Sequence, residues 1–154
     1  PYTEYDPSNY HGLYARLVED GPLVTLYRSG KYIVSGCSSF EELYDTNDAF
    51  LSKLSELDIV DATTQIEFTV QNVVCTGQLE AGVDLNTLSI ALGLESVEYE
   101  PEQFPGLIYR PADYPAVLLV FANGKIVVTG ASDVESAEEA FEHIQEQVTT
   151  YLEQ

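Results

Sequence analysis

Few residues of this chain are suited to catalysis. His11 and His143 could serve as general bases, but the sequence suggests no nucleophile that would pair with either of them. The dipeptide at 124–125 is Gly-Lys, yet it lacks the earlier glycine of a phosphate-binding loop. Cys37 and Cys75 do not have metal-ligand spacing and are expected to be packed, reduced thiols. The sequence therefore predicts no enzyme activity, no cofactor and no metal site, and His143 is expected to be a solvated helix residue.

An aromatic residue on a stiff acidic loop is a better candidate for a functional group. Residues 98–110 read EYEPEQFPGLIYR, so that acids and prolines surround Phe104. Proline restricts the backbone, which makes the loop rigid. The apolar run AVLLVFANGKIVVTG follows at 116–130. A rigid loop that holds an aromatic ring beside apolar strands predicts a binding surface.

The charge balance narrows the class of partner and the environment. Six lysines and arginines stand against 26 acids, which gives a formal net charge of -20. Such a chain ordinarily repels nucleic acid, and this favours a protein-binding or solubility-selected domain. The same acid load, without any methionine, suits a protein that works in molar salt, where the Debye length falls to about 3 Å and self-repulsion is screened. Halophilic origin is the favoured interpretation of the two.

The composition is that of a folded protein. With 154 residues, 45% of them apolar, the chain can form one large core or two small ones. No apolar run approaches the ~20 residues of a membrane span. The first ten residues lack the basic start and apolar centre of a signal peptide. The expected location is therefore the cytoplasm, with no membrane partner.

The chain contains an internal repeat. Residues 4–37 align with residues 98–131 without a gap after a shift of 94 positions, and ten of the thirty-four pairs are identical. The shared glycines and prolines lie where turns are expected, because turns demand their special backbone geometry. We therefore predict a duplicated architecture.

The domain organisation follows from this repeat. Residues 1–57 are predicted to form a first repeat, 58–66 a linker and 67–154 a second, complete repeat. The first repeat has no counterpart of residues 67–94, so it is expected to lack an opening strand and helix. Either a leading half-repeat is missing from this sequence, which is the favoured interpretation, or the protein is naturally truncated.

Each repeat is predicted to contain a strand, a stiff loop, three strands and a closing helix. Ser29-Gly30 and Asn123-Gly124 mark hairpin turns between runs rich in β-branched and aromatic residues. Helical periodicity predicts long helices over 39–57 and 133–152, and Ser132-Asp133 is the expected cap of the second one.

The second repeat has additional elements at its start. Residues 67–77, EFTVQNVVCTG, are predicted to form a strand, and a short helix is expected to begin at Asp84. Because the first repeat lacks this strand, nine strands are expected rather than ten. The predicted fold class is α+β, with an antiparallel sheet that carries helices on one face only.

The face without helices is expected to be apolar. Every residue of 117–121 is apolar, so that Leu119, Phe121 and, across the hairpin, Val127 lie on the uncovered face. Exposed apolar surface of this extent marks a binding site or a layer that is itself covered. A covered sandwich is the less favoured alternative, because no segment remains to form the covering layer.

The few cations favour an anionic ligand. Arg16 is equivalent to Arg110 in the repeat and Lys31 to Lys125, whereas only Lys53 lies on a predicted helix. Positive charge that surrounds an apolar sheet face suits phosphates flanking a groove.

These motifs resemble the TATA-box-binding protein family, the archaeal form especially. The resemblance is specific in residues 67–154, with QNVV (71–74), EPEQFPGLIYR (100–110) and LLVFANGKIVVTGA (118–131), and it is looser in residues 4–57. It implies a saddle of two tandem repeats, a curved antiparallel sheet with helices on the convex face only. It also implies a general transcription initiation factor that binds double-stranded promoter DNA in the minor groove, bends it and recruits transcription factor B, with RNA polymerase as an indirect partner.

The resemblance, together with the cations, implies roles for individual residues. Phe104 and Phe121 match a pair of wedges that enter the base stack, Tyr10 and Tyr27 occupy the equivalent positions of the first repeat, and Asn72 matches a central asparagine. The residues expected to contact DNA are Asn72, Val74, Phe104, Arg110, Leu119, Phe121, Lys125, Val127, Thr129, Tyr10, Arg16, Tyr27, Arg28, Lys31, Ile33 and Ser35. The residues expected to contact transcription factor B are Glu98, Tyr99, Glu100, Glu102 and Gln103.

The first repeat departs from the family pattern. Tyrosine stands at both of its wedge positions, and a second central asparagine is missing. A hydroxyl brought among the bases needs a partner or costs about 1 to 3 kcal/mol. The alternative function is therefore that of a truncated, degenerate family member, a protein-interaction module with weak or no DNA binding.

Overall fold

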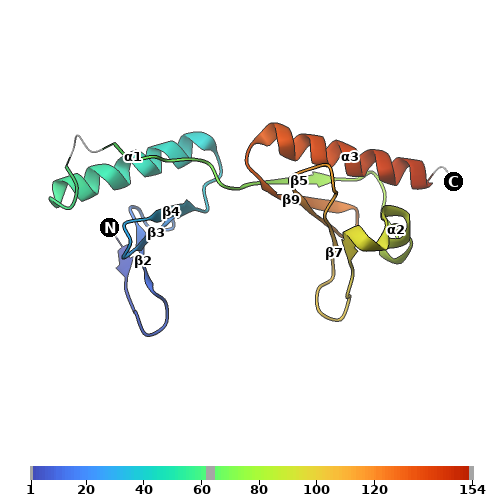
Figure 1. Ribbon diagram of the computed structural model, residues 1–154, viewed down its shortest axis with the longest axis horizontal. Coiled ribbons are helices and arrows are strands. Elements are labelled where there is room, and N and C mark those ends of the chain that lie inside the picture. Colours follow the sequence, from blue (N-terminus) through green and yellow to red (C-terminus); the bar gives the residue numbers. More distant parts are fainter. Residues whose placement is uncertain (1, 62–64, 153–154) are drawn as a thin grey trace. The chain divides into compact units, whose positions relative to one another are not determined.

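The chain folds into two compact units, Pro1–Ile66 and Glu67–Gln154. The computed structural model describes residues 2–61 and 65–152. Nine strands occur within these described residues, as the repeat analysis predicted. Each unit is an antiparallel sheet with a long helix packed against it (Figure 1), which confirms the expected α+β class.

The first unit contains four strands and one helix. Its sheet has the order β1-β2-β3-β4, and α1 contacts β4. The bounds of its elements are β1 Tyr2–Glu4, β2 Gly12–Arg16, β3 Leu23–Tyr27, β4 Tyr32–Ser35 and α1 Phe40–Glu56. The helix therefore agrees with the range predicted from periodicity.

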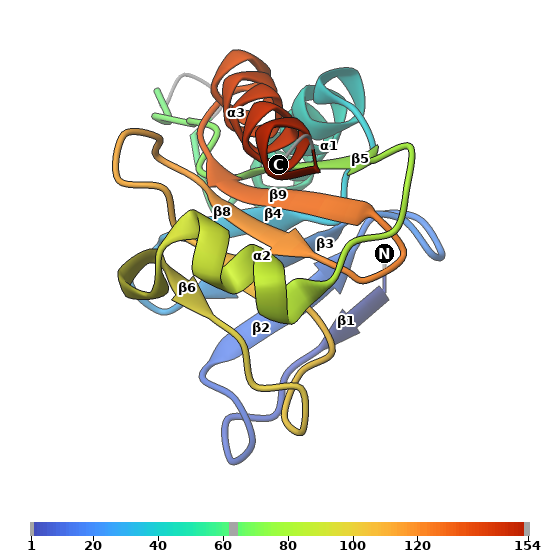
Figure 2. The ribbon, with the colours of Figure 1, turned by 90° about the vertical axis from the view of Figure 1, so that its right-hand side faces the viewer.

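The second unit contains five strands and two α-helices. Its sheet has the order β5-β9-β8-β7-β6, α3 contacts β9 and β5, and α2 contacts both α3 and β6 (Figure 2). The bounds are β5 Val73–Gln78, α2 Leu85–Leu92, a 3-10 turn η1 Leu94–Ser96, β6 Val97–Glu98, β7 Leu107–Tyr109, β8 Val117–Val120, β9 Lys125–Ala131 and α3 Val134–Leu152. α3 confirms the second predicted helix.

Local hydrogen bonds explain where the helices begin. Ser39 Oγ accepts a hydrogen bond from the Glu42 amide at 3.1 Å at the start of α1, and Asp133 accepts one from the Ser136 amide at 2.7 Å before α3. Asp84 accepts from the Asn86 amide at 3.0 Å and so begins α2. Each side chain satisfies a backbone donor that the first helical turn leaves without a partner.

The two predicted hairpin turns have the same geometry. Gly30 and Gly124 have φ of 89° and 88°, in the left-handed region that glycine adopts without strain. In each turn the glycine amide donates at 2.9 Å to the carbonyl three residues earlier, which is that of Tyr27 at the end of β3 or of Phe121 just after β8. The repeat in the sequence is therefore a repeat in backbone conformation.

The strand predicted over 67–77 was placed too early. β5 begins at Val73, which pairs with Ala131 at the end of β9. Beyond Ala131 the chain turns into α3, so the backbone pairing between β5 and β9 ends at Val73. Strand propensity alone does not produce a strand where the neighbouring strand ends.

The second unit has much the larger apolar core. Among the described residues it buries sixteen apolar side chains in one cluster, to which α2 contributes Leu85 and Leu88. Of the described residues of the first unit, the buried apolar side chains are those of Ala15, Val24 and Phe50. The described part of the first unit has no counterpart of α2, so less surface of its helix is covered. We therefore expect the first unit to be the less stable of the two.

Candidate nucleic-acid interface

The sheet of the second unit has one buried face and one open face. Leu118, Val120, Ile126 and Val128 are at most 1% exposed and belong to the core. The side chains that alternate with them are partly exposed, and they are Val117, Leu119, Phe121, Val127 and Thr129. Alternate side chains point to opposite faces of a strand, so the open face is the apolar one that the sequence predicted.

A pair of aromatic rings stands at one end of this open face. The centroids of Phe104 and Phe121 are 5.9 Å apart and their planes are inclined by 68°. The rings lie over Gly106: a Cβ atom at that position would come within 2.8 Å of the Phe104 ring and 3.1 Å of the Phe121 ring. Glycine is therefore needed here for space.

The acidic loop positions Phe104. The amides of Gln103 and Phe104 both donate to the Glu100 carbonyl, at 2.9 and 3.0 Å, and close a tight turn before the ring. Glu100 and Glu102 are exposed, whereas Tyr99 packs against the core. The loop thus presents carboxylates outward and an aromatic ring toward the open face.

One expected DNA contact is engaged within the protein. Arg110 Nη1 lies 3.1 Å from Glu98 Oε1, with side chains that are 54% and 66% exposed. An ion pair at the surface is weak, at about 0 to 1 kcal/mol. Arg110 is therefore partly neutralised by the acidic loop but easily released.

Asn72 and Thr129 meet, although they are 57 positions apart in the chain. Asn72 Oδ1 accepts a hydrogen bond from the Gly130 amide at 2.7 Å, and its Nδ2 is 3.4 Å from Thr129 Oγ1. Val74, on the same side of β5, is 59% exposed. The Gly130 contact holds the Asn72 amide in place beside Thr129.

The first unit repeats this arrangement with tyrosines. The ring centroids of Tyr10 and Tyr27 are 6.2 Å apart at an inclination of 66°, and their hydroxyls are hydrogen-bonded at 2.7 Å. A Cβ atom on Gly12 would come within 2.9 Å of Tyr10 and 3.3 Å of Tyr27. Ile33 and Ser35 of β4 are exposed. Both units therefore hold an aromatic pair over a glycine.

The remaining cations lie at strand ends and turns, apart from Lys53 of α1. Arg28, Lys31 and Lys125 are exposed around the two hairpin turns. Arg16 donates through Nη1 to the carbonyl of Gly21. Lys53 of α1 pairs with Glu56 at 3.1 Å, so that this helix cation belongs to a local ion pair.

Several residues of the open faces were not predicted, among them Thr76, Ile108 and Tyr14. Thr76 pairs with Val127 across the sheet, Ile108 pairs with Leu119, and Tyr14 pairs with Thr25. The signal was present, since Thr76 follows Asn72 and Val74 at the period of two of a strand, and Tyr14 is the repeat equivalent of Ile108.

The expectation of a solvated His143 was wrong. This side chain is half-buried, its Nε2 is hydrogen-bonded to the Tyr109 hydroxyl at 3.0 Å, and its ring stacks on Tyr114 at 4.7 Å. Burial raises the pKa of Tyr109. The loop between β7 and β8 brings Tyr114 onto α3, and helical periodicity alone does not show that contact.

The described residues that could support other chemistry form no recognisable site. Cys37 and Cys75 are free, partly buried thiols, and burial raises the pKa of Cys37. Among residues 2–61 and 65–152 there is no group of three histidine, cysteine or acidic side chains placed to hold a metal ion. In the same residues no helix is long and apolar enough to cross a membrane.

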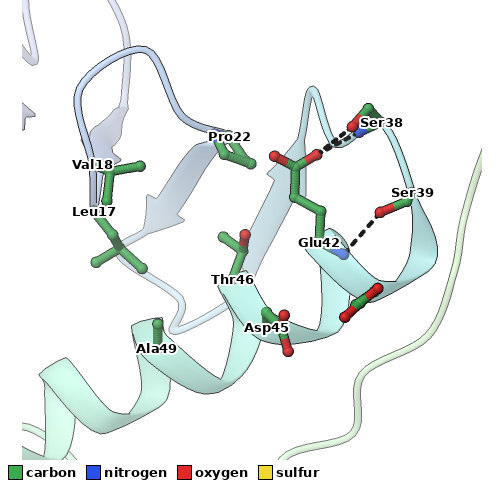
Figure 3. Close-up of a pocket in the computed structure, with 10 residues that line it drawn as sticks. Leu17, Val18, Pro22, Ser38, Ser39, Glu42, Asp45, Thr46 and Ala49 are labelled. Atoms are coloured by element: carbon green, nitrogen blue, oxygen red, sulfur yellow. Dashed lines mark hydrogen bonds between the residues drawn. The ribbon is translucent and has the colours of Figure 1, made fainter.

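A shallow hollow of about 530 Å³ lies in the first unit between the loop after β2 and the start of α1 (Figure 3). Its lining residues are Leu17, Val18, Pro22, Ser38, Ser39, Glu41, Glu42, Asp45, Thr46 and Ala49. Hydrogen bonds from Ser38 lower the pKa of Glu42, which keeps this wall anionic. Three carboxylates make the hollow unsuitable for a phosphate, and it does not belong to the aromatic face.

Each of the two related α+β units has an antiparallel sheet with an aromatic pair on its open face, and together they define a duplicated protein of the antiparallel-sheet class. The sequence model of the family described as "Transcription factor TFIID (or TATA-binding protein, TBP)" matches residues 1–57 and 67–151, and the chain belongs to this family.

Several similar curated proteins come from haloarchaea. "TATA-box-binding protein C" of Halobacterium salinarum is 63% identical over 148 residues, which are 96% of this chain and 82% of the relative. A "TATA-box-binding protein" of Natronomonas pharaonis is 40% identical over 143 residues, which are 92% of this chain and 75% of the relative. These relatives confirm the archaeal, halophilic type that the resemblance and the acid load indicated.

A solved structure shows the same fold. The structure described as "Methanococcus jannaschii TBP" matches with a TM-score of 0.81 at 34% sequence identity. The match covers 96% of this chain and 83% of the other. The chain thus has the fold of a family of TATA-box-binding transcription factors, as predicted.

Proposed function

We propose that the chain binds double-stranded promoter DNA in the minor groove, bends it and recruits transcription factor B, and through that factor RNA polymerase, in the cytoplasm. The observation that carries the proposal is that each unit holds a pair of aromatic wedges. The ring centroids are 5.9 Å apart in the second unit and 6.2 Å apart in the first. Apolar wedges that unstack base steps are the usual device of proteins that bend DNA from the minor groove.

The groove-facing groups have the right chemistry for this role. The minor groove presents mainly the acceptors adenine N3 and thymine O2. Asn72 and Thr129 supply small donors, and Leu119, Phe121 and Val127 supply apolar surface. Charged side chains such as arginine are not required on the floor of the groove, which agrees with the position of the sheet cations Arg28, Lys31 and Lys125 around the hairpin turns.

The charge of the protein predicts an unusual response to salt. An ordinary DNA-binding protein releases condensed cations and loses affinity steeply as salt rises. A chain of net charge -20 instead brings carboxylates near the phosphates, so cations are trapped between the two surfaces. Affinity should then hold or rise toward molar potassium chloride.

A titration of DNA binding against salt tests the proposal. The fluorescence anisotropy of a duplex with an A/T-rich centre is measured from about 0.2 to 2 M potassium chloride, a span over which the Debye length falls from roughly 7 to 2 Å. Flat or rising affinity for the wild type and collapse for Phe121→Ala support it. Ile90→Ala is the matched control, because Ile90 is also apolar but is 70% exposed on α2, away from the open face.

The acidic loop is the proposed contact with transcription factor B. Glu100 and Glu102 are exposed, and the turn that places Phe104 holds them outward. A basic partner surface would complement them, and such contacts at the rim of an interface chiefly affect association rate and salt dependence. Tyr99 anchors the loop to the core of the second unit.

A degenerate family member that acts only through protein contacts is the second candidate. The small core of the first unit and the hydroxyls of its wedge pair favour it. It predicts that no duplex is bound at any salt concentration, while transcription factor B still binds. The same titration, repeated with the labelled factor in place of DNA, separates the two candidates.

A further inference from the structure

The aromatic pair of the first unit differs from that of the second unit in its hydrogen-bonding groups. Tyr10 and Tyr27 have the inclination of Phe104 and Phe121, 66° against 68°, so the rings present similar shapes. The tyrosines add two hydroxyls, which are bonded to each other at 2.7 Å. The two open faces are therefore alike in shape and different in chemistry.

The mutual bond leaves the hydroxyls partly available. Two tyrosine hydroxyls together carry two hydrogens, and their mutual bond uses one of them. One O–H donor and several acceptor lone pairs remain. The pair can therefore enter a groove with each hydroxyl already partnered once, and still donate one hydrogen bond and accept others.

Neighbouring rings hold the tyrosine pair in this arrangement. Tyr14 stacks on Tyr10 at 5.2 Å and 4°, and His11 lies against Tyr10 at 4.6 Å. The equivalent positions in the second unit are Ile108 and Pro105, which have no polar side-chain group. The tyrosines are thus supported by a set of aromatic residues found in the first unit.

In the minor groove, a single hydrogen-bond donor distinguishes a G·C pair from an A·T pair. A·T and T·A pairs show only acceptors, whereas a G·C pair adds the 2-amino group of guanine. A phenylalanine pair that covers this amino group removes water from it and gives no acceptor in return, which is unfavourable. A tyrosine oxygen can accept its hydrogen bond, and the remaining O–H can donate to adenine N3 or thymine O2.

We propose that the Tyr10–Tyr27 pair allows the first unit to accept a guanine amino group at the DNA step it covers, whereas the Phe104–Phe121 pair restricts the second unit to A·T pairs. This inference rests on the proposed minor-groove binding. The two ends of the bound site then differ in base preference, and this difference orients the protein on the promoter.

Reciprocal hydroxyl exchange tests the inference. One variant, Y10F/Y27F, removes both hydroxyls from the first unit, and the matched variant, F104Y/F121Y, adds two to the second. Each protein is titrated against an A/T-rich duplex and a series in which a single G·C pair replaces A·T at successive positions. In the wild type, a G·C pair should be tolerated about five- to tenfold better in one half of the site than in the other, as expected for one hydrogen bond.

The variants should change this asymmetry in opposite ways. Y10F/Y27F should lose the tolerance in that half, and F104Y/F121Y should gain tolerance in the other half. Replacing guanine by inosine, which lacks the 2-amino group, should remove the differences among all proteins. The single variants Tyr10→Phe and Tyr27→Phe each keep one hydroxyl and should show intermediate tolerance, which keeps the test decisive if the double variant folds poorly.

Two results would overturn the inference while leaving the proposed function intact: equal G·C penalties in both halves for the wild type, or unchanged asymmetry in Y10F/Y27F. An asymmetry that persists with inosine would also overturn it, because it would not depend on the amino group. Failure of the wild type to bind even the A/T-rich duplex would refute the proposed function itself, and the inference with it.

Discussion

Gly106→Ala is expected to weaken DNA binding by displacing the wedge pair. The new Cβ would stand 2.8 Å from the Phe104 ring and 3.1 Å from the Phe121 ring. Ordinary contacts between carbon atoms are about 3.5 to 4.0 Å, so the rings must move by roughly half an ångström or more. The φ angle of Gly106 is not in the left-handed region, so alanine adds bulk here without backbone strain.

The expected loss of DNA affinity follows from comparing two costs of Gly106→Ala: the cost to the folded protein and the cost to the DNA complex. Phe104 is only partly buried and can move outward. The free energy of unfolding should therefore fall by no more than about 1 kcal/mol, the low end of the cost of overpacking. Stacking of an aromatic ring on a base contributes about 1 to 3 kcal/mol. Displacing the ring should therefore reduce DNA affinity by roughly ten- to a hundredfold.

Anisotropy titration with an A/T-rich duplex measures the affinity, and urea unfolding measures the stability. Gly93→Ala is the matched control: its φ is +97°, the nearest atoms to the added Cβ are those of the flexible Glu95 carboxylate, and it lies between α2 and η1, away from the open face. That control should lose about 1 kcal/mol or more of stability through backbone strain, with affinity unchanged. Wild-type affinity in a correctly folded Gly106→Ala variant would refute the role assigned to the rings.

Three further predictions follow from the same structure. Charge reversal in E100K/E102K should weaken the ternary complex with transcription factor B in a gel-shift assay but not binary DNA binding; equal loss in both would mean that the loop only supports the fold. Hydrogen bonds from Ser136 lower the pKa of Asp133 below 3.8, so the stability from this cap is present above pH 3.8 and is lost as the pH falls through the lower folded pKa; Asp133→Asn, which keeps the cap, should show less acid destabilisation in thermal unfolding at pH 7 and pH 3, and identical pH dependence would contradict this. Amides of β7 to β9 should exchange with deuterium more slowly than those of β2 to β4, because sixteen buried apolar residues stabilise the second unit and three the first; uniform exchange would count against the difference in stability.

The features predicted correctly from the sequence depend on short-range rules. The hairpin turns follow from glycines that adopt positive φ at 30 and 124, and the ends of the helices follow from cap residues such as Asp133. The open apolar face follows from strand alternation around Leu119 and Val127. Each of these signals involves residues that are neighbours along the chain or across one tight turn.

The features that were missed depend on distant contacts. The start of β5 is decided by the end of β9, to which it pairs near Ala131. The half-buried state of His143 is decided by Tyr114, which a loop carries onto α3. Neither contact leaves a periodic pattern in the sequence, because the two partners lie far apart along the chain.

By itself, the sequence determined the duplication, the order of strands and helices, and the residue types that face outward, since these follow from backbone propensity and periodicity. Only the tertiary structure decided that the Tyr10 and Tyr27 hydroxyls are bonded to each other and that Gly12 and Gly106 make room for the rings. It also decided that Glu98 holds Arg110 and that Gly130 holds Asn72. Hydrogen bonds and steric contacts depend on distances of a few tenths of an ångström, and such distances are set only when the strands and loops have packed together.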